Sequence, residues 1–125
     1  RDNKIAEAVD LVERELARNR DIRQQAMMLS SELQAMTESL AEIKPESVRA
    51  QALEAISIEV SLTNRLFDYN DYLNQLLNVL KDKFLYNIPP VRGKIDDLIT
   101  KINGEAKAIH ELNSQFNSQI QNIFS

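Results

Sequence analysis

The stretch NIPP, residues 87–90, separates the second and third parts of the chain. A proline lacks the backbone N–H donor and its ring clashes with the preceding helical turn, so two consecutive prolines end a helix. Pro45 makes an earlier break, because a proline disfavours helical geometry in the residue before it and suits the first turn of a new helix. The two breaks divide the 125 residues into three segments.

Each segment carries the pattern of an amphipathic helix. Apolar residues recur every three or four positions over 2–43, 46–86 and 91–124, which are the helices we expect. Helix-favouring residues dominate, while two glycines and three prolines are too few for a turn-rich β protein. Short connections make consecutive helices antiparallel. The expected fold is all-α, a single domain over 1–125 that forms an elongated antiparallel three-helix bundle with coiled-coil-like packing.

A polar segment in the first helix leaves one alternative open. Within RNRDIRQQ, residues 18–25, the apolar stripe shifts sideways, and a break over residues 17–24 would give a four-helix bundle. Three helices place the start of the first and the end of the last at opposite ends of the rod. That topology suits a spacer or a scaffold with a single anchor.

The second helix is apolar on two sides. The stripe from Leu62 to Phe84 lies well over a right angle away from a second stripe on a helical wheel. That second stripe contains Leu53, Ile56, Val60 and Phe67. Either the contact line winds around the rod as the neighbours change, or one apolar side is left over for another chain.

The last helix has an uncharged surface. The stretch NSQFNSQIQN, residues 113–122, carries only amides and hydroxyls around Phe116 and Ile120. Such a surface favours hydrogen-bonded contacts with another chain, and the alternative explanation, which we prefer, is a plain solvated face. Together with the extra apolar stripe, it defines a candidate interaction surface made of Leu53, Ile56, Val60, Phe67, Phe116 and Ile120.

The stretch FDYNDYLNQ, residues 67–75, is the richest in side-chain chemistry. In a helix Asp68 and Asp71 project to solvent, with Arg65 placed to pair with Asp68. A calcium loop does not fit, because the later ligand positions and the turn glycine are missing. The alternative to a surface role is a small-ligand pocket between the helices, near Asn64, Tyr69 and Asn70.

Several function classes lack their residues. The chain has no cysteine, His110 is its only histidine, and Lys107 stands where a Glu-x-x-His metal motif needs a glutamate. We therefore expect no catalytic residue, no cofactor and no metal site. The net charge of −4 gives no reason to expect nucleic acid as a partner.

The leading hypothesis is a non-enzymatic helical scaffold or interaction module that binds a protein partner or itself, and the alternative is a small-ligand sensor. No apolar run approaches the ~18 residues of a membrane span. Because the chain begins without Met, we expect an excised segment or a processed product, from which an upstream anchor or signal has been removed. The origin we expect is the soluble extracytoplasmic part of a membrane-anchored protein, with the anchor outside this chain.

Overall fold

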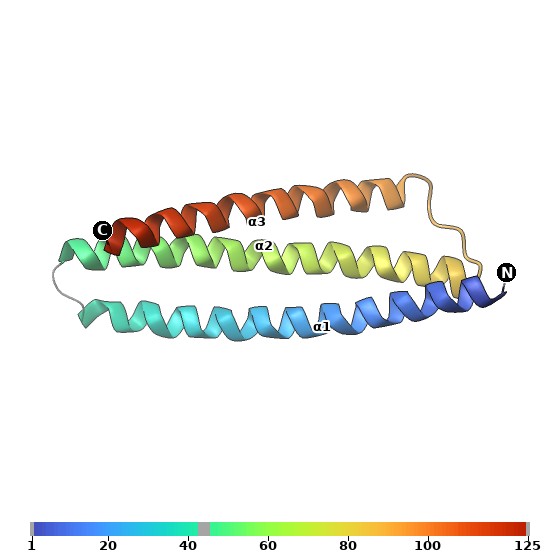
Figure 1. The fold of residues 1–125 in the computed structure, drawn as a ribbon, viewed down its shortest axis with the longest axis horizontal. Coiled ribbons are helices and arrows are strands. Elements are labelled where there is room, and N and C mark those ends of the chain that lie inside the picture. Colours follow the sequence, from blue (N-terminus) through green and yellow to red (C-terminus); the bar gives the residue numbers. More distant parts are fainter. Residues whose placement is uncertain (1, 43–45, 125) are drawn as a thin grey trace.

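The computed structural model describes residues 2–42 and 46–124, and these form three long helices (Figure 1). They are α1 (Asp2–Ser39), α2 (Glu46–Leu85) and α3 (Lys94–Phe124), with a short 3₁₀ turn, η1 (Leu40–Glu42), after α1. The described residues contain no strand. The predicted all-α fold with three antiparallel helices is confirmed.

The first helix is continuous through its polar segment. Residues 17–24 lie inside α1, so the four-helix alternative is not adopted. The expected end of this helix at residue 43 lies outside the described residues. The start of α1 and the end of α3 lie at opposite ends of the rod, as three helices require (Figure 1).

The connection between α2 and α3 is set by two residues with left-handed backbone geometry. Asn87 (φ 54°) follows the end of α2, where Asn is one of the few residues that tolerates this conformation. Gly93 (φ 80°) precedes α3, and its carbonyl accepts a hydrogen bond from the Asp97 N–H at 2.9 Å. The third helix therefore begins at Lys94 rather than at the predicted residue 91.

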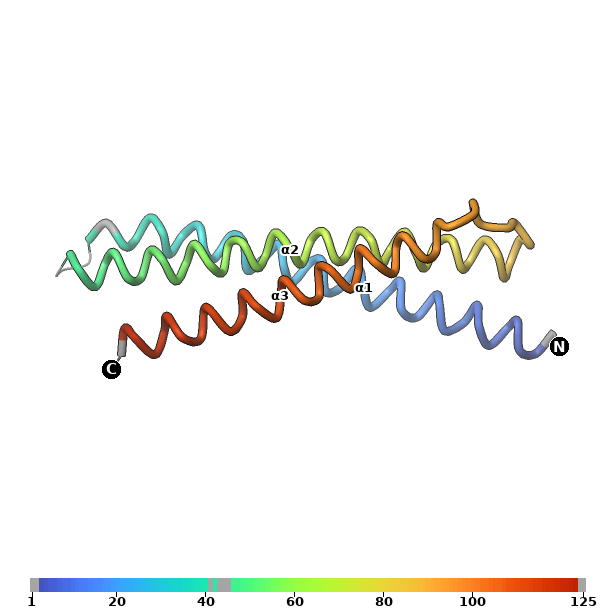
Figure 2. The backbone as a smooth tube through the Cα atoms, turned by 90° about the horizontal axis from the view of Figure 1, so that it is seen from above, coloured from blue at the N-terminus to red at the C-terminus, as the bar shows by residue number. Residues whose placement is uncertain are grey.

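The middle helix holds the fold together. α1 and α3 each pack along α2, but no Cα atom of α1 lies within 8 Å of a Cα atom of α3 in the described residues. Figure 1 shows α2 between its two neighbours, and Figure 2 shows α1 and α3 each inclined to α2, so that they diverge from it at opposite ends of the rod. The bundle is an open array of three helices and not a closed triangle.

The contact between α1 and α2 has two apolar ends and a polar middle. The cluster near the start of α1 contains Val12, Leu16 and Leu77, with Leu73, Leu80 and Phe84 packed against it. The cluster near the end of α1 contains Leu33, Leu40 and Ile56, with Leu29 and Ala52 packed against it. Between them lies a buried pair of asparagines, Asn19 and Asn70.

Candidate interaction site

The face of α2 that contacts α1 follows a regular spacing of three and four residues. Its residues in the two apolar clusters and at the asparagine pair are Ala52, Ile56, Asn70, Leu73, Leu77, Leu80 and Phe84. This is the seven-residue repeat of coiled-coil packing. Glu59, Thr63 and Leu66 occupy the same repeat between Ile56 and Asn70.

The face of α2 that contacts α3 follows the same repeat, displaced by one residue. Arg65 forms an ion pair with Glu105 at 3.1 Å, and Lys101 lies 5.5 Å from the ring centroid of Tyr72. The carbonyl of Gln51 accepts a hydrogen bond from the Gln119 side chain at 3.3 Å. Contacts at 51, 65 and 72 lie one position before 52, 66 and 73, which belong to the repeat that faces α1.

From this one-residue displacement, the angle between the two neighbours of α2 can be estimated with ideal helix geometry. An α-helix turns by about 100° per residue, so α1 and α3 lie about 100° apart around α2. In a closed three-helix bundle the angle would be about 60°, and in a square four-helix bundle about 90°. By this count the three helices correspond to three positions of a four-helix arrangement, with α1 and α3 on either side of α2 (Figure 1).

The side of α1 that faces the open corner lies opposite the side on which α1 forms ion pairs with α2. Glu13 contacts Lys81 at 2.6 Å, and Arg23 contacts Asp71 at 2.5 Å, on the edge of α2 that points away from α3. Glu13 and Arg20 each follow a residue of α1 that contacts α2, namely Val12 and Asn19. Another series of α1 residues comes just before the positions that contact α2, so it lies on the other edge of α1. This series, on the α3 side, is Ile22, Leu29 and Met36.

The same reasoning identifies the side of α3 that faces the open corner. Ala108 and Gln115 line shallow grooves with Ser61 and Asn64, on the edge of α2 that points away from α1. The series that follows the contact residues Leu98, Glu105, Leu112 and Gln119 lies on the opposite edge. Its members are Ile99, Ala106, Asn113 and Ile120.

These side chains form an apolar surface, which we call the corner face. Ile22 is 40% exposed, Met36 53% and Ile99 42%. From α2 the positions that point between the two neighbours are Glu59 and Leu66, both half-buried. The corner face is defined as Ile22, Leu29, Met36, Glu59, Leu66, Ile99, Ala106, Asn113 and Ile120.

Glu59 is the only carboxylate that α2 contributes to the corner face. Burial raises its pKa above the usual value of 4.5. The nearby Thr63 hydroxyl donates to the backbone carbonyl of Glu59 at 2.8 Å, and in the described part of the chain no group donates to the Glu59 carboxylate. A half-buried charge without a donor is unfavourable, because desolvation is not offset.

The structure divides the predicted interaction surface. Leu53 and Val60 are exposed, on the outer edge of α2 that points away from α3. Ile56 is buried against Leu33 and Leu40, so the prediction that it lies on the surface is wrong. It occupies the repeat that faces α1, which places it in the core.

The aromatic and C-terminal members of that surface have separate environments. Phe67 is half-buried, with the Arg23 guanidinium 5.4 Å from its ring centroid. Phe116 and Ile120 are half-buried on α3, and of the six predicted residues only Ile120 belongs to the corner face. The two predicted stripes of α2 therefore do not match its two neighbours. Ile56 of one stripe and Leu73 of the other both face α1, and Leu53 and Val60 lie outside both contacts.

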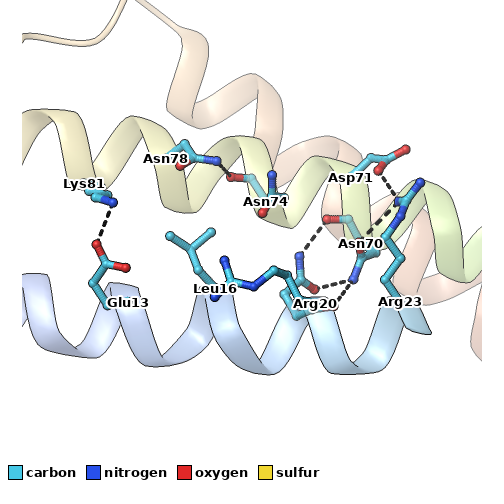
Figure 3. A pocket seen from close by; sticks show the side chains of 10 residues that line it. Glu13, Leu16, Arg20, Arg23, Asn70, Asp71, Asn74, Asn78 and Lys81 are labelled. Carbon is cyan, nitrogen blue, oxygen red and sulfur yellow. Dashed lines mark hydrogen bonds and ion pairs between the residues drawn. The ribbon is translucent and has the colours of Figure 1, made fainter. Parts of the chain in front are cut away.

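The predicted ligand-pocket residues do not share one groove. Asn70 lines a polar groove of about 440 Å³ between α1 and α2 (Figure 3). Asn64 lines a different groove toward α3, and Tyr69 is half-buried on the α3 side of α2. The Asn70 side chain is already engaged, since its amide nitrogen donates to the Asn19 carbonyl at 2.6 Å.

Two charged residues have partners other than those the sequence indicated. Arg65 pairs with Glu105 of α3 rather than with Asp68 of its own helix. Asp71 accepts a hydrogen bond from Arg23 instead of projecting freely into solvent (Figure 3). Both side chains join helices, which a reading of α2 alone could not show.

None of Ile22, Met36, Ala106 and Glu59 was singled out from the sequence alone. The missed signal is the seven-residue spacing of Ile22, Leu29 and Met36, which runs beside the repeat that faces α2. A helix that carries a second apolar repeat beside the first can pack against two other helices. In this fold one of these two places beside α1 is unoccupied.

Metal binding and membrane spanning can also be examined in the described residues. Across residues 2–42 and 46–124, no three His, Asp or Glu side chains are grouped so as to hold a metal ion. Within the same ranges no helix combines the length and apolar character needed to cross a membrane.

Comparisons with protein-family models, with curated proteins and with solved structures found no match to this chain. The function is therefore inferred from the geometry of the three helices.

Proposed function

We propose that this chain is a non-enzymatic helical interaction module that binds one helix of a partner protein along the corner face. The observation that carries the proposal is the angle of about 100° between the two contact lines on α2, which leaves a fourth helix position open. A helix in that position would contact α1 and α3 at once and cover apolar side chains that both expose.

The exposed side chains on the corner face support this proposal. Isolated apolar residues on a surface are ordinary, but a contiguous apolar surface marks an interaction site. Ile22, Met36 and Ile99 are each at least 40% exposed, and in the register set by Asn19 and Asn70, Ile22 lies level with the half-buried Leu66. Covering apolar surface stabilises a complex by about 25 cal/mol per Å² before the costs of association.

Charge favours a partner of different composition over a second copy of this chain. The chain carries a net charge of −4, so two copies repel each other at low ionic strength. Glu59 adds an unpaired carboxylate within the corner face. A helix with a net positive charge would associate faster, because opposite charge steers the encounter.

The test is the binding of a designed amphipathic helix of about 28 residues, with Leu or Ile at its a and d positions and a basic outer face. Fluorescence anisotropy of the labelled peptide measures its affinity for the wild-type chain. Ile22→Asp and Ile99→Asp are expected to weaken binding at least tenfold, because each places a charge within the apolar contact. Circular dichroism checks that the variants stay folded.

Leu53→Asp and Val60→Asp provide the matched controls. Both residues are exposed to the same degree as Ile22 and Ile99, but they lie on the outer edge of α2. They are expected to leave the affinity unchanged. The proposal fails if the peptide does not bind, or if these two variants weaken binding while Ile22→Asp does not.

Self-association is a separate outcome with its own signature. Light scattering across a dilution series is expected to give a monomer of 14.3 kDa. A dimer that Ile22→Asp disperses would assign the corner face to a second copy and contradict a partner of different composition.

The small-ligand sensor receives less support from the geometry. Its three residues point to separate environments, and the carboxamide of Asn70 already contacts Asn19 and Arg23. A ligand at this position would have to displace hydrogen bonds that join α1 to α2.

A further inference from the structure

We infer that the helix bound at the corner face carries a Lys or Arg that pairs with Glu59. This inference rests on the proposed function and adds the chemistry of the partner at one position. It follows from where Glu59 lies, from what surrounds it and from what docking would do to its carboxylate.

Glu59 lies at the centre of the corner face. It occupies the repeat of α2 that faces α1, and it follows Ile58, which occupies the repeat that faces α3. Its Cα–Cβ bond therefore points between the two neighbouring helices. Leu66 occupies the equivalent position two turns later, which shows that an apolar side chain also fits at this place in the repeat.

The charged groups of the surrounding helices do not satisfy Glu59. Arg23 of α1 contacts Asp71 on the outer edge, and Arg65 of α2 contacts Glu105 of α3. Lys101 of α3 contacts Asp97 and lies over the Tyr72 ring. In the described residues no cation pairs with Glu59. Its charged form is already disfavoured, because burial raises the pKa of its carboxyl group.

A helix docked over Glu59 raises the free-energy cost of its buried charge, unless that helix supplies a hydrogen-bond donor. Covering a carboxylate with apolar side chains removes its remaining water and leaves an uncompensated charge. A lysine or arginine at the facing position would form a charge-assisted hydrogen bond instead. The same pair would fix the register of the partner helix, as a single polar residue does in coiled coils.

The experiment uses a series of designed peptides that share one apolar core and differ only in the position of a single lysine. On the wild-type chain, one lysine position is expected to bind at least tenfold more tightly than the all-apolar peptide. On Glu59→Leu the order is expected to reverse, with the all-apolar peptide binding more tightly. Glu111→Leu, on an exposed residue that lines the outer groove, is the matched control and should keep the wild-type order.

A charge swap separates pairing from a general effect of charge. Glu59→Lys is expected to bind a peptide with glutamate at the preferred position and to reject the lysine peptide. The affinity of the lysine peptide for the wild-type chain is expected to fall when acid protonates Glu59, whereas that of the all-apolar peptide should rise.

The outcomes distinguish this inference from the proposed function. If the all-apolar peptide binds the wild-type chain as tightly as every lysine peptide, the inference is overturned while the interaction module stands. If Glu59→Leu leaves the lysine preference intact, the cation pairs elsewhere and the inference also fails. If no peptide binds either form, the proposed function itself is wrong.

Discussion

Asn19 of α1 and Asn70 of α2 exchange hydrogen bonds in both directions. The Asn19 side chain donates to the Asn70 backbone carbonyl at 2.9 Å, and the Asn70 side chain donates to the Asn19 carbonyl at 2.6 Å. Only 3% of Asn19 and 4% of Asn70 is exposed. Because a shift by one repeat would leave both buried amides without partners, the pair sets the register of α1 on α2.

Replacing one member of this pair is expected to destabilise the fold. Asn70→Ala leaves the Asn19 amide buried with fewer partners, which costs about 1–3 kcal/mol. Urea unfolding followed by circular dichroism measures the change in free energy of unfolding. An unchanged midpoint would show that water replaces the lost partner and that the pair does not hold the two helices in register.

Replacing both members has a different expected result. Asn19→Leu with Asn70→Leu turns the polar middle into a continuous apolar line, so stability stays within about 1 kcal/mol of wild type or rises. Register is expected to become less unique, because the remaining contact residues allow a shift of seven positions. Broader amide resonances in NMR spectra of the double variant would report that loss, and spectra as sharp as wild type would contradict it.

Ile56 and Val60 are predicted to differ in their effect on stability. Ile56 is 7% exposed inside an apolar cluster, so Ile56→Ala should cost about 2–4 kcal/mol through lost burial and a residual cavity. Val60 is exposed, and Val60→Ala should change stability by less than about 1 kcal/mol. Thermal unfolding of the two variants gives the comparison. Equal losses would mean that the outer edge of α2 is also buried.

Glu59 predicts a pH dependence of stability. Its pKa is higher in the folded chain than the usual 4.5, so the folded state binds more protons in that range and stability falls as pH rises through the folded-state pKa. Glu59→Gln removes the buried charge and is expected to raise the melting temperature at pH 7. The gain should vanish below about pH 4, where the wild-type side chain is protonated in both states. A gain that is the same at both pH values would contradict this explanation.

The ion pair between Arg65 and Glu105 is predicted to be the stronger of two pairs that a double-mutant cycle can compare. The Glu105 side chain is 12% exposed, whereas Arg14 and Asp10 are both mostly exposed. The coupling energy of Arg65 with Glu105 should reach about 1 kcal/mol, and that of Arg14 with Asp10 should stay below about 0.5 kcal/mol. The explanation fails if the two coupling energies are equal.

The fold could be predicted from local features of the sequence. The prolines at 45, 89 and 90 and the spacing of three and four residues were sufficient for three helices and their order. The start of α3 was misplaced because the helical spacing continues into residues 91–93, where Gly93 has left-handed geometry. The continuity of α1 was left open because Asn19 and Arg23 find their partners on α2, more than 45 residues away in the chain.

The candidate site could be predicted only in part. Two apolar stripes on α2 were visible in the sequence, but Ile56 of one and Leu73 of the other both contact α1, so the stripes do not correspond to the two neighbouring helices. Glu59 resembled any other surface glutamate, since its burial follows from its position between α1 and α3. Arg65 had a candidate partner three residues along its own helix, and the partner on another helix appears only after folding.

The proposed function depends on α1 and α3 staying apart and leaving a fourth helix position open. Disulfide trapping tests it directly, since the chain has no cysteine of its own and a disulfide needs Cα atoms within about 7 Å. Asn19 lies level with Asn70 and Glu105 lies level with Arg65, so Ile22 and Ala106 face each other within about one helical turn.

The measurement compares the rate of disulfide formation in two double variants under mild oxidation. Arg65→Cys with Glu105→Cys, across the packed contact between α2 and α3, is expected to cross-link rapidly. Ile22→Cys with Ala106→Cys, across the open corner, is expected to remain reduced. Cross-linking of the second variant at the rate of the first would show that α1 and α3 close against each other, and would contradict the open corner on which the proposed function depends.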